Sequence, residues 1–209
     1  MKIELETVKP EDIEKRSFEI ISSELATPPA PELAPVVLRV IHTTADFEYA
    51  DSLYFSPGAI PAALAALKSG ARIVTDTNMA KAGVNKDALD SLGGEVFCFM
   101  ADEDVAAAAK ADGATRAVAS MNKAAALEGR LIFAVGNAPT ALIRLCELIG
   151  EGRVTPALVI GVPVGFVNVV QSKELIMQTQ VPCIVARGRK GGSNVAAAIV
   201  NALMYMITR

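Results

Sequence analysis

His42 is the only histidine among the 209 residues, so any chemistry that needs an imidazole has one candidate. An imidazole has a pKa near neutrality and can act as a general acid or base. Arg39 stands three residues earlier in a helical pattern, which makes the two side chains neighbours on one helix face. The alternative is an ordinary surface histidine, or one that caps a helix C-terminus with help from the dipole, and the pattern alone favours this alternative.

Three glycine-containing loops each follow a predicted strand and lead into a predicted helix. They are GNAPTAL (136–142), GVPVGFVN (161–168) and RGRKGGSN (187–194). In an open parallel sheet, ligands bind beyond the carboxyl ends of the strands, and glycine-rich helix starts offer N–H groups to anions. Arg187, Arg189 and Lys190 add positive charge. Plain turns also use glycine, but three such loops at one edge favour an anionic ligand.

The sequence lacks the usual nucleotide and hydrolase motifs. GxGxxG and GxxxxGK(S/T) do not occur, and RGRKGGS lacks the phosphate-loop spacing. A GxSxG nucleophile elbow is also missing. These absences argue against a nucleotide as the ligand. A ligand that bears several carboxylates fits the glycine-rich, basic loops as well as one that bears phosphates.

Short, continuously apolar runs alternate with helical segments from residue 58 onward, as in parallel strands covered on both faces. The predicted strands are 72–75, 95–99, 131–135, 157–160 and 183–186, and 53–55 could add a short piece. The predicted helices are 60–68, 86–92, 104–109, 115–127, 139–149, 173–178 and 194–207. We expect a single domain over residues 1–209 with an α/β fold, a flavodoxin-like three-layer sandwich with a mostly parallel five-stranded sheet.

Two extra N-terminal helices are predicted before the sheet, over residues 11–25 and 32–43. Ile13, Ile20 and Ile21 share one arc of the first helix, and Ser17 falls inside that arc. A polar group on a burying face needs a partner or a purpose. A hydrogen bond from Ser17 to the carbonyl one turn back explains it as well as a ligand contact does. Because both helices carry polar groups on both faces, we expect them near a homodimer interface that completes a binding site.

The composition argues against several other classes of protein. A net charge of −3 does not suit a nucleic-acid-binding domain, and one histidine cannot build a multi-histidine metal site. The three cysteines are widely spaced without a CxxC pattern, so we expect buried free thiols in a reducing cytoplasm and no metal. The charged N-terminal segment lacks the apolar core of a secretory leader. The long uncharged stretches contain proline, glycine or asparagine, so we expect no membrane span.

Several segments together resemble the precorrin-8X methylmutase family, which includes the cobalt-precorrin-8 methylmutases of cobalamin biosynthesis. They are EKRSF (14–18), RVIHTTAD (39–46), YFSPGAI (54–60), GNAPTAL, GVPVGFVN followed by Ser172 and Lys173, and RGRKGGS (187–193). The resemblance covers nearly the whole chain. It implies an isomerase that shifts a methyl group between adjacent ring C carbons of a macrocycle. It also implies a homodimer with sites at the subunit interface and no cofactor, because the methyl group is already on the substrate and any cobalt belongs to that substrate.

The resemblance and the three loops together give the expected site. His42 is the implied acid/base residue, and the expected substrate contacts are Ser17, Arg39, Arg116, Asn137, Arg187, Gly188, Gly191, Gly192 and Ser193. Acetate and propionate groups of a tetrapyrrole would suit the arginines. Asn85 stands where threonine is expected in relatives, which puts that one contact in doubt.

Two other functions remain open from the sequence alone. A non-catalytic carrier of corrinoids would keep the same fold and the same ligand. A nucleotide-binding enzyme of flavodoxin type is the second alternative, against which the missing phosphate-loop spacing argues.

Overall fold

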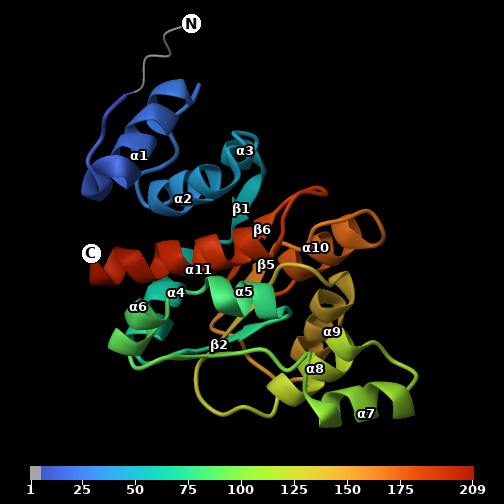
Figure 1. Ribbon diagram of the computed structural model, residues 1–209. Coiled ribbons are helices and arrows are strands. Elements are labelled where there is room, and N and C mark those ends of the chain that lie inside the picture. Colours follow the sequence, from blue (N-terminus) through green and yellow to red (C-terminus); the bar gives the residue numbers. More distant parts are fainter. Residues whose placement is uncertain (1–5) are drawn as a thin grey trace, which may run out of the picture.

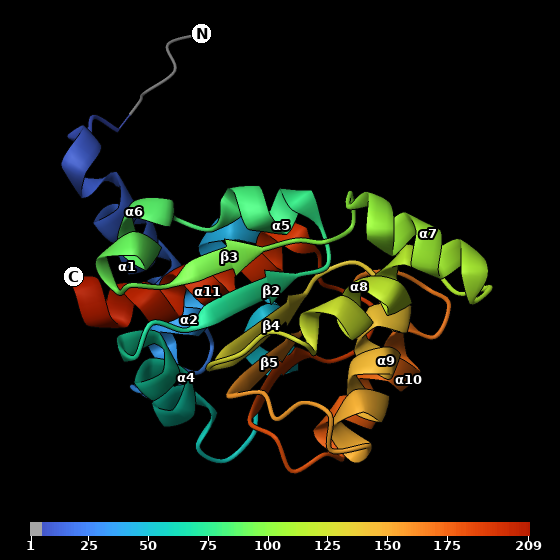
Figure 2. The same cartoon turned by 90° about the horizontal axis from the view of Figure 1, so that it is seen from below.

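The computed structural model describes residues 6–209, and six strands form one sheet in the order β1-β6-β5-β4-β2-β3 (Figures 1 and 2). The strands are β1 Leu53–Phe55, β2 Arg72–Thr75, β3 Glu95–Phe97, β4 Leu131–Val135, β5 Leu158–Gly161 and β6 Cys183–Ala186. Residues 1–5, which belong to the N-terminal segment expected not to be a secretory leader, lie outside the described part.

The expectation of a mostly parallel α/β sheet is confirmed, but the expected count of five strands is wrong by one. Strands β2 to β6 pair in parallel. The sixth strand, β1, pairs antiparallel with β6, so that Leu53 lies opposite Ala186 and Phe55 opposite Ile184. A strand of three residues is too short to show a clear pattern, and its partner follows more than a hundred residues later in the chain.

Helices cover both faces of this sheet. They are η1 Pro10–Asp12, α1 Ile13–Glu24, α2 Ala34–Thr44, α3 Tyr49–Ser52, α4 Ala59–Lys68, α5 Asn78–Gly83, α6 Lys86–Ser91, α7 Glu103–Ala111, α8 Arg116–Ala124, α9 Pro139–Gly150, α10 Val169–Met177 and α11 Ser193–Thr208. The short helices α3 and α5 are absent from the sequence prediction. Among the described residues, none of the helices is long and apolar enough to span a bilayer.

Two apolar clusters lie on opposite faces of the sheet. The larger one contains buried residues of α2, α4, α5, α6 and α11, and the other contains buried residues of α8, α9 and α10. Helix α2 packs along α11, and α1 packs on α2, so the two predicted N-terminal helices add a further layer outside α11 (Figure 1). Only Ile21 of the expected apolar arc of α1 is buried, whereas Ile13 and Ile20 are exposed.

The strand order places a natural ligand position at the carboxyl ends of β2 and β4. These strands are neighbours, yet the chain continues from β2 to β3 on one side and from β4 to β5 on the other. The loops that follow them therefore run in opposite directions, which is the arrangement at which open α/β sheets usually bind their ligands. The loops singled out by their glycines follow β4, β5 and β6, beside this point.

The three cysteines are free and buried, as predicted. Burial raises the pKa of Cys146 to about 12, so its thiol stays protonated near neutral pH. A protonated, buried thiol is a poor nucleophile and metal ligand. The cysteines are therefore part of the packed interior.

Candidate active site

The loops after β5 and β6 are held against each other by backbone hydrogen bonds. Gly192 donates its N–H to the carbonyl of Val162 at 2.9 Å, and Gly165 donates its N–H to the carbonyl of Arg189 at 3.1 Å. A Cβ atom on Gly191 would collide with the carbonyl oxygen of Val162. The glycines here allow one loop to lie directly on the other, which is a structural role independent of any ligand.

Asp76 follows β2 directly and organises the loop after β4, although the sequence analysis does not single it out. Its carboxylate accepts hydrogen bonds from the N–H groups of Gly136 at 2.8 Å, Asn137 at 2.8 Å and Ala138 at 2.6 Å. Burial raises the pKa of this carboxyl, and the three amides partly offset that effect. Because these three N–H groups are already bound, they are not available to an anion. The side chain of Asn137 is exposed and can still contact a ligand.

Ser193 links the start of α11 to the loop after β2. Its hydroxyl oxygen lies 2.7 Å from that of Thr77, which also accepts a hydrogen bond from the N–H of Ala80 at 3.0 Å and so caps α5. A Cβ on Gly136 would lie 2.8 Å from the Cα of Ser193. A substrate contact of Ser193 would thus share a hydroxyl that Thr77 already uses.

Residues 187–190, which we call the cationic loop, present two uncompensated positive charges. Arg187 and Arg189 are exposed, and neither makes a salt bridge with any residue in 6–209. The guanidinium carbon of Arg187 lies 4.8 Å from the ring centre of Tyr54, and that of Arg189 lies 5.4 Å from the ring centre of Phe166. Both guanidinium groups are open to an anionic ligand.

Arg116 lies at the same edge of the sheet. It is the first residue of α8 and is exposed. The hydroxyl of Thr115, just before it, lies 3.3 Å from that of Thr140 in the first turn of α9, which itself follows β4. The starts of α8 and α9 are therefore neighbours, and Arg116 and Asn137 lie at the carboxyl edge of the sheet with the cationic loop.

His42 is exposed in the last turn of α2, close to a link between this helix and the cationic loop. Its ring meets that of Phe18 edge-on, with ring centres 5.6 Å apart. The ammonium of Lys190 donates a hydrogen bond to Asp46 at 2.6 Å and lies 2.8 Å from a carboxylate oxygen of Glu48. Asp46 follows His42 by four residues, beyond the end of α2 at Thr44 and the left-handed Ala45. The imidazole is open to solvent near the end of α2, and this ion pair joins the segment after that helix to the cationic loop.

Arg39 faces α1 and α11 and is held there by an ion pair. Its two terminal nitrogens donate to the two carboxylate oxygens of Glu14 at 2.7 and 2.8 Å. Its guanidinium carbon lies 4.9 Å from the ring centre of Phe18 and 5.0 Å from that of Tyr205. Its remaining nitrogen, Nε, is buried and has no hydrogen-bond partner within the described residues. A substrate carboxylate could take the terminal nitrogens only by displacing Glu14.

Ser17 and Arg39 do not converge with the loops in one copy of the chain. The hydroxyl of Ser17 donates to the carbonyl of Ile13 at 2.8 Å, which is the local alternative that the sequence analysis left open. Arg39 lies beside Tyr205, which is twelve residues from Ser193 in α11, or about 18 Å along the helix. Their roles as substrate contacts stay predictions.

Replacing Glu14 with glutamine should remove a pH-dependent part of the stability. The hydrogen bond from Arg39, with further help from nearby cations, lowers the pKa of Glu14 in the folded state. A lowered carboxyl pKa stabilises the fold above the unfolded value of 4.5, and this stabilisation is lost as the pH falls through the folded value. We expect a difference of at most about 1 kcal/mol, because exposed ion pairs contribute little. Urea unfolding of both proteins at pH 7 and pH 3 measures it, and an identical pH dependence would contradict the assignment.

Comparison with known proteins identifies the family. A family model described as Precorrin-8X methylmutase matches residues 12–206. The chain is 48% identical over 201 residues to a cobalt-precorrin-8 methylmutase of Priestia megaterium, covering 96% of this chain and 89% of that protein. It is 43% identical to a precorrin-8X methylmutase of Pseudomonas aeruginosa, covering 91% and 93%. The solved structure of a precorrin-8x methyl mutase from Thermus thermophilus matches with a TM-score of 0.87 at 44% identity, covering 94% and 95%. The chain belongs to the precorrin-8X methylmutase family.

The family predicted from the sequence motifs is thus confirmed, and one departure from its expected pattern has a local explanation. Asn85 caps α6, since its side-chain oxygen accepts the N–H of Ala88 at 3.0 Å. Its side-chain nitrogen donates to the hydroxyl of Tyr205 at 2.9 Å. In this methylmutase chain, Asn85 therefore joins α6 to α11 through bonds within the fold.

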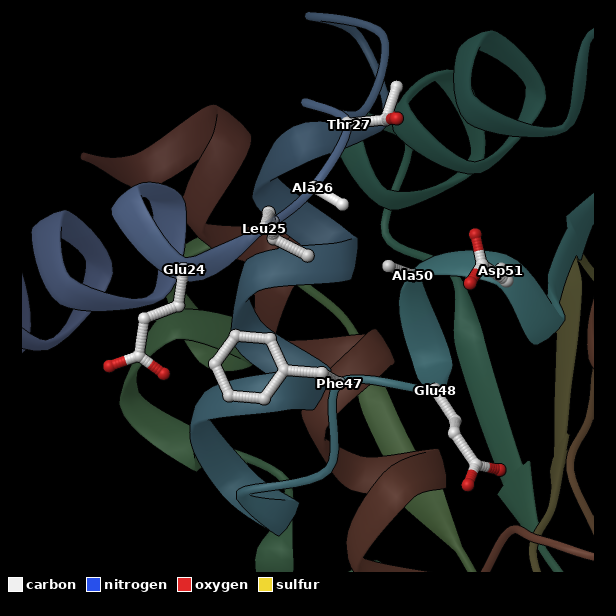
Figure 3. A pocket seen from close by; sticks show the side chains of 8 residues that line it. All are labelled: Glu24, Leu25, Ala26, Thr27, Phe47, Glu48, Ala50 and Asp51. Atoms are coloured by element: carbon white, nitrogen blue, oxygen red, sulfur yellow. The ribbon is translucent and has the colours of Figure 1, made fainter.

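A cavity of about 360 Å³ between the end of α1 and α3 does not suit the methylmutase substrate (Figure 3). Glu24, Glu48 and Asp51 contribute carboxylates to its lining, beside the ring of Phe47. A tetrapyrrole with several carboxylates would be repelled by these groups. None of the predicted site residues lines this cavity.

Proposed function

We propose that this chain catalyses the intramolecular methyl shift between adjacent ring C carbons of precorrin-8X or cobalt-precorrin-8. The products are hydrogenobyrinate or cobyrinate. One observation carries the proposal: in a chain matched by the methylmutase model over residues 12–206, the only histidine is solvent-exposed, and the segment after its helix is bonded to the cationic loop through Asp46 and Lys190. An imidazole and free arginines are what a proton-assisted rearrangement of a polycarboxylate needs.

In this mechanism, His42 donates a proton or a hydrogen bond to the macrocycle near ring C. That interaction shifts the electron distribution of the conjugated ring, so that the methyl group leaves one carbon as it bonds to its neighbour. Substrate and product are isomers, so the donated proton must be released by the end of the turnover. The chain needs no cofactor for this step, and cobalt, when present, arrives as part of the substrate.

The peripheral carboxylates of the substrate are bound mainly by Arg187 and Arg189, with Arg116 and the side chain of Asn137 at the same edge. Arg187 and Arg189 are exposed and make no salt bridge within residues 6–209, and both observations support this assignment. Gly188, Gly191, Gly192 and Ser193 shape the loop around them. Arg39 contributes a contact after Glu14 is displaced, and Ser17 contributes one through its hydroxyl, which in this chain donates to the carbonyl of Ile13.

Substituting both loop arginines should weaken substrate binding strongly. Hydrogen bonds to charged groups contribute about 1.5–3 kcal/mol each, so each arginine should account for roughly ten- to a hundredfold in affinity. Titration of Arg187→Ala/Arg189→Ala with hydrogenobyrinate, followed by absorption, measures this loss. Lys68→Ala, an exposed lysine at the end of α4, serves as the control for a simple loss of positive charge. Equal affinities of the parent and the double variant would exclude the cationic loop as the carboxylate site.

The active form is a homodimer, and the N-terminal helices lie near its interface. Ile13 and Ile20, seven residues apart on one arc of α1, are 51% and 38% exposed, and a pair of large apolar side chains on one helix face supports a surface that a partner covers. A second copy would also explain how Arg39 and Ser17 join a site that one copy does not assemble.

Substituting Ile13 and Ile20 together with glutamate should produce a monomer. Burying two carboxylates in an apolar contact is costly, so association should weaken at least tenfold. Sedimentation velocity at micromolar concentration measures the change against Lys110→Glu, an exposed position on α7. A parent that sediments only as a monomer would refute the dimer.

Two finer assignments complete the proposal. The five parallel strands run in the order 2-1-3-4-5 when numbered among themselves, which supports a flavodoxin-like grouping with an added antiparallel edge. The three unpaired cysteines support a reducing cytoplasmic compartment.

Incubation with precorrin-8X and, separately, with its cobalt form tests the function directly. Conversion to the corrin product changes the conjugation and is followed by absorption spectra. A carrier without catalytic activity would bind the ligand and leave its chemical identity unchanged. Binding without conversion of either substrate would therefore replace the methylmutase proposal with the carrier.

A further inference from the structure

Lys173 on α10 is a fully buried lysine without an acidic partner among the described residues. Its side chain is 0% exposed, and its ammonium donates hydrogen bonds to the carbonyl of Gly188 at 2.9 Å and that of Lys190 at 2.7 Å. Burial lowers the pKa of this amine to about 8. A buried ammonium that is bound only to carbonyl groups costs folding free energy, which a methionine or leucine of similar size would avoid. The position therefore carries a charge for a reason other than packing.

The two carbonyl groups that Lys173 binds flank the residue that presents a free guanidinium. Arg189 lies between Gly188 and Lys190, and Arg187 precedes Gly188 directly. The carbonyl of Arg189 in turn accepts the N–H of Gly165 from the loop that leads toward α10. Lys173 and Gly165 together therefore bind the carbonyl groups of three successive residues of the cationic loop.

We propose that Lys173 is a positioning residue of the substrate site: it holds the cationic loop in the conformation that presents Arg187 and Arg189 to the carboxylates of the substrate. This inference rests on the proposed function for the identity of the ligand. The part of the inference that concerns the loop conformation does not depend on the ligand, because it rests on the two hydrogen bonds from Lys173. The charge of the ammonium also adds to the positive potential under the two arginines, which favours an anionic ligand.

Amide hydrogen exchange tests the loop conformation without any ligand. Gly165 and Gly192 are suitable reporters, because their N–H groups are bonded to Arg189 and Val162 across the two loops. In Lys173→Met, we expect both amides to exchange at least tenfold faster than in the parent, with no change at Gly136, whose N–H is bonded to Asp76. The control is Lys110→Met, which removes an exposed lysine on α7. Unchanged exchange at both reporters would overturn the proposal.

A variant cycle tests whether Lys173 acts through the two arginines. Affinity for hydrogenobyrinate is measured for the parent, Lys173→Met, Arg187→Ala/Arg189→Ala and the triple variant. We expect Lys173→Met to weaken binding at least tenfold in the parent but less than twofold in the double-arginine background. The same tenfold loss in both backgrounds would overturn the positioning role, because it would mean that Lys173 affects binding by another route.

Two further experiments distinguish a failure of the positioning role from a variant that does not fold and from a failure of the proposed function. If Lys173→Met does not fold, Lys173→Gln replaces it, and the same changes are expected because the shorter amide cannot reach both carbonyls. If the parent does not bind hydrogenobyrinate, the proposed function fails, and the exchange experiment alone decides whether Lys173 holds the loop.

Discussion

Replacing His42 with alanine should lower kcat for conversion of precorrin-8X by about 10²–10⁴-fold, the usual contribution of a positioned acid or base. The side chain is exposed and packs edge-on against Phe18, so its loss should leave the fold and the affinity for product nearly unchanged. No second histidine in the chain can replace it. Single-turnover absorption measurements separate this loss of chemistry from any loss of binding.

Two further variants sharpen the test of His42. His42→Asn keeps a hydrogen-bond donor without the titratable ring, so partial activity would favour hydrogen bonding over proton transfer. Thr43→Ala is the matched control, because Thr43 is exposed on the same turn and its hydroxyl bonds only the carbonyl of Arg39. If His42→Ala rearranges the substrate at the parent rate, His42 is a surface residue and the proposed mechanism fails.

Replacing Asp76 with alanine should have the largest effect on stability of any single substitution considered. It would leave three N–H groups before α9 without their acceptor, of which that of Gly136 is buried and those of Asn137 and Ala138 are partly buried. Since an unsatisfied buried group costs about 1–3 kcal/mol and a partly buried one less, we expect a loss of about 3 kcal/mol in the free energy of unfolding. Asp76→Asn should lose less, because its remaining oxygen still accepts a hydrogen bond.

Urea unfolding at pH 7 measures the effect of both Asp76 variants. Asp90→Ala, which removes an exposed aspartate of α6, is the control for the loss of a carboxylate. A change below about 1 kcal/mol in Asp76→Ala would show that water or another group satisfies the three amides.

The strands that carry the site are predictable where the sequence is continuously apolar. The strands 72–75, 131–135 and 183–186 agree with the structure residue for residue, because each is a buried run with polar or turn residues at both ends. Helix α10 begins four residues before its predicted start at Lys173, and Asn168 adopts a left-handed conformation just before it. The two valines at the start of α10 continue the apolar composition of the loop before it. The sequence pattern therefore does not reveal where α10 begins.

The candidate site is predictable in its residue types but not in its pairings. Single-residue properties point to His42 and Arg187, since one is the only imidazole and the other lies in a basic, glycine-rich loop. The partner of Arg39 is Glu14, twenty-five residues away on another helix, which no local pattern identifies. Asp76 carried a usable signal, because it is a carboxylate directly after a buried parallel strand. The burial of Lys173 could not be predicted from its residue type, because lysine is almost never fully buried.

The sheet ends at both edges on strands of only three residues, β1 and β3. An edge strand exposes unpaired N–H and C=O groups that can template further strands, and short edges are one way in which proteins prevent this. Two copies of the chain would therefore gain few hydrogen bonds by joining sheets edge to edge. The folded protein should therefore resist the strand addition that begins ordered aggregation.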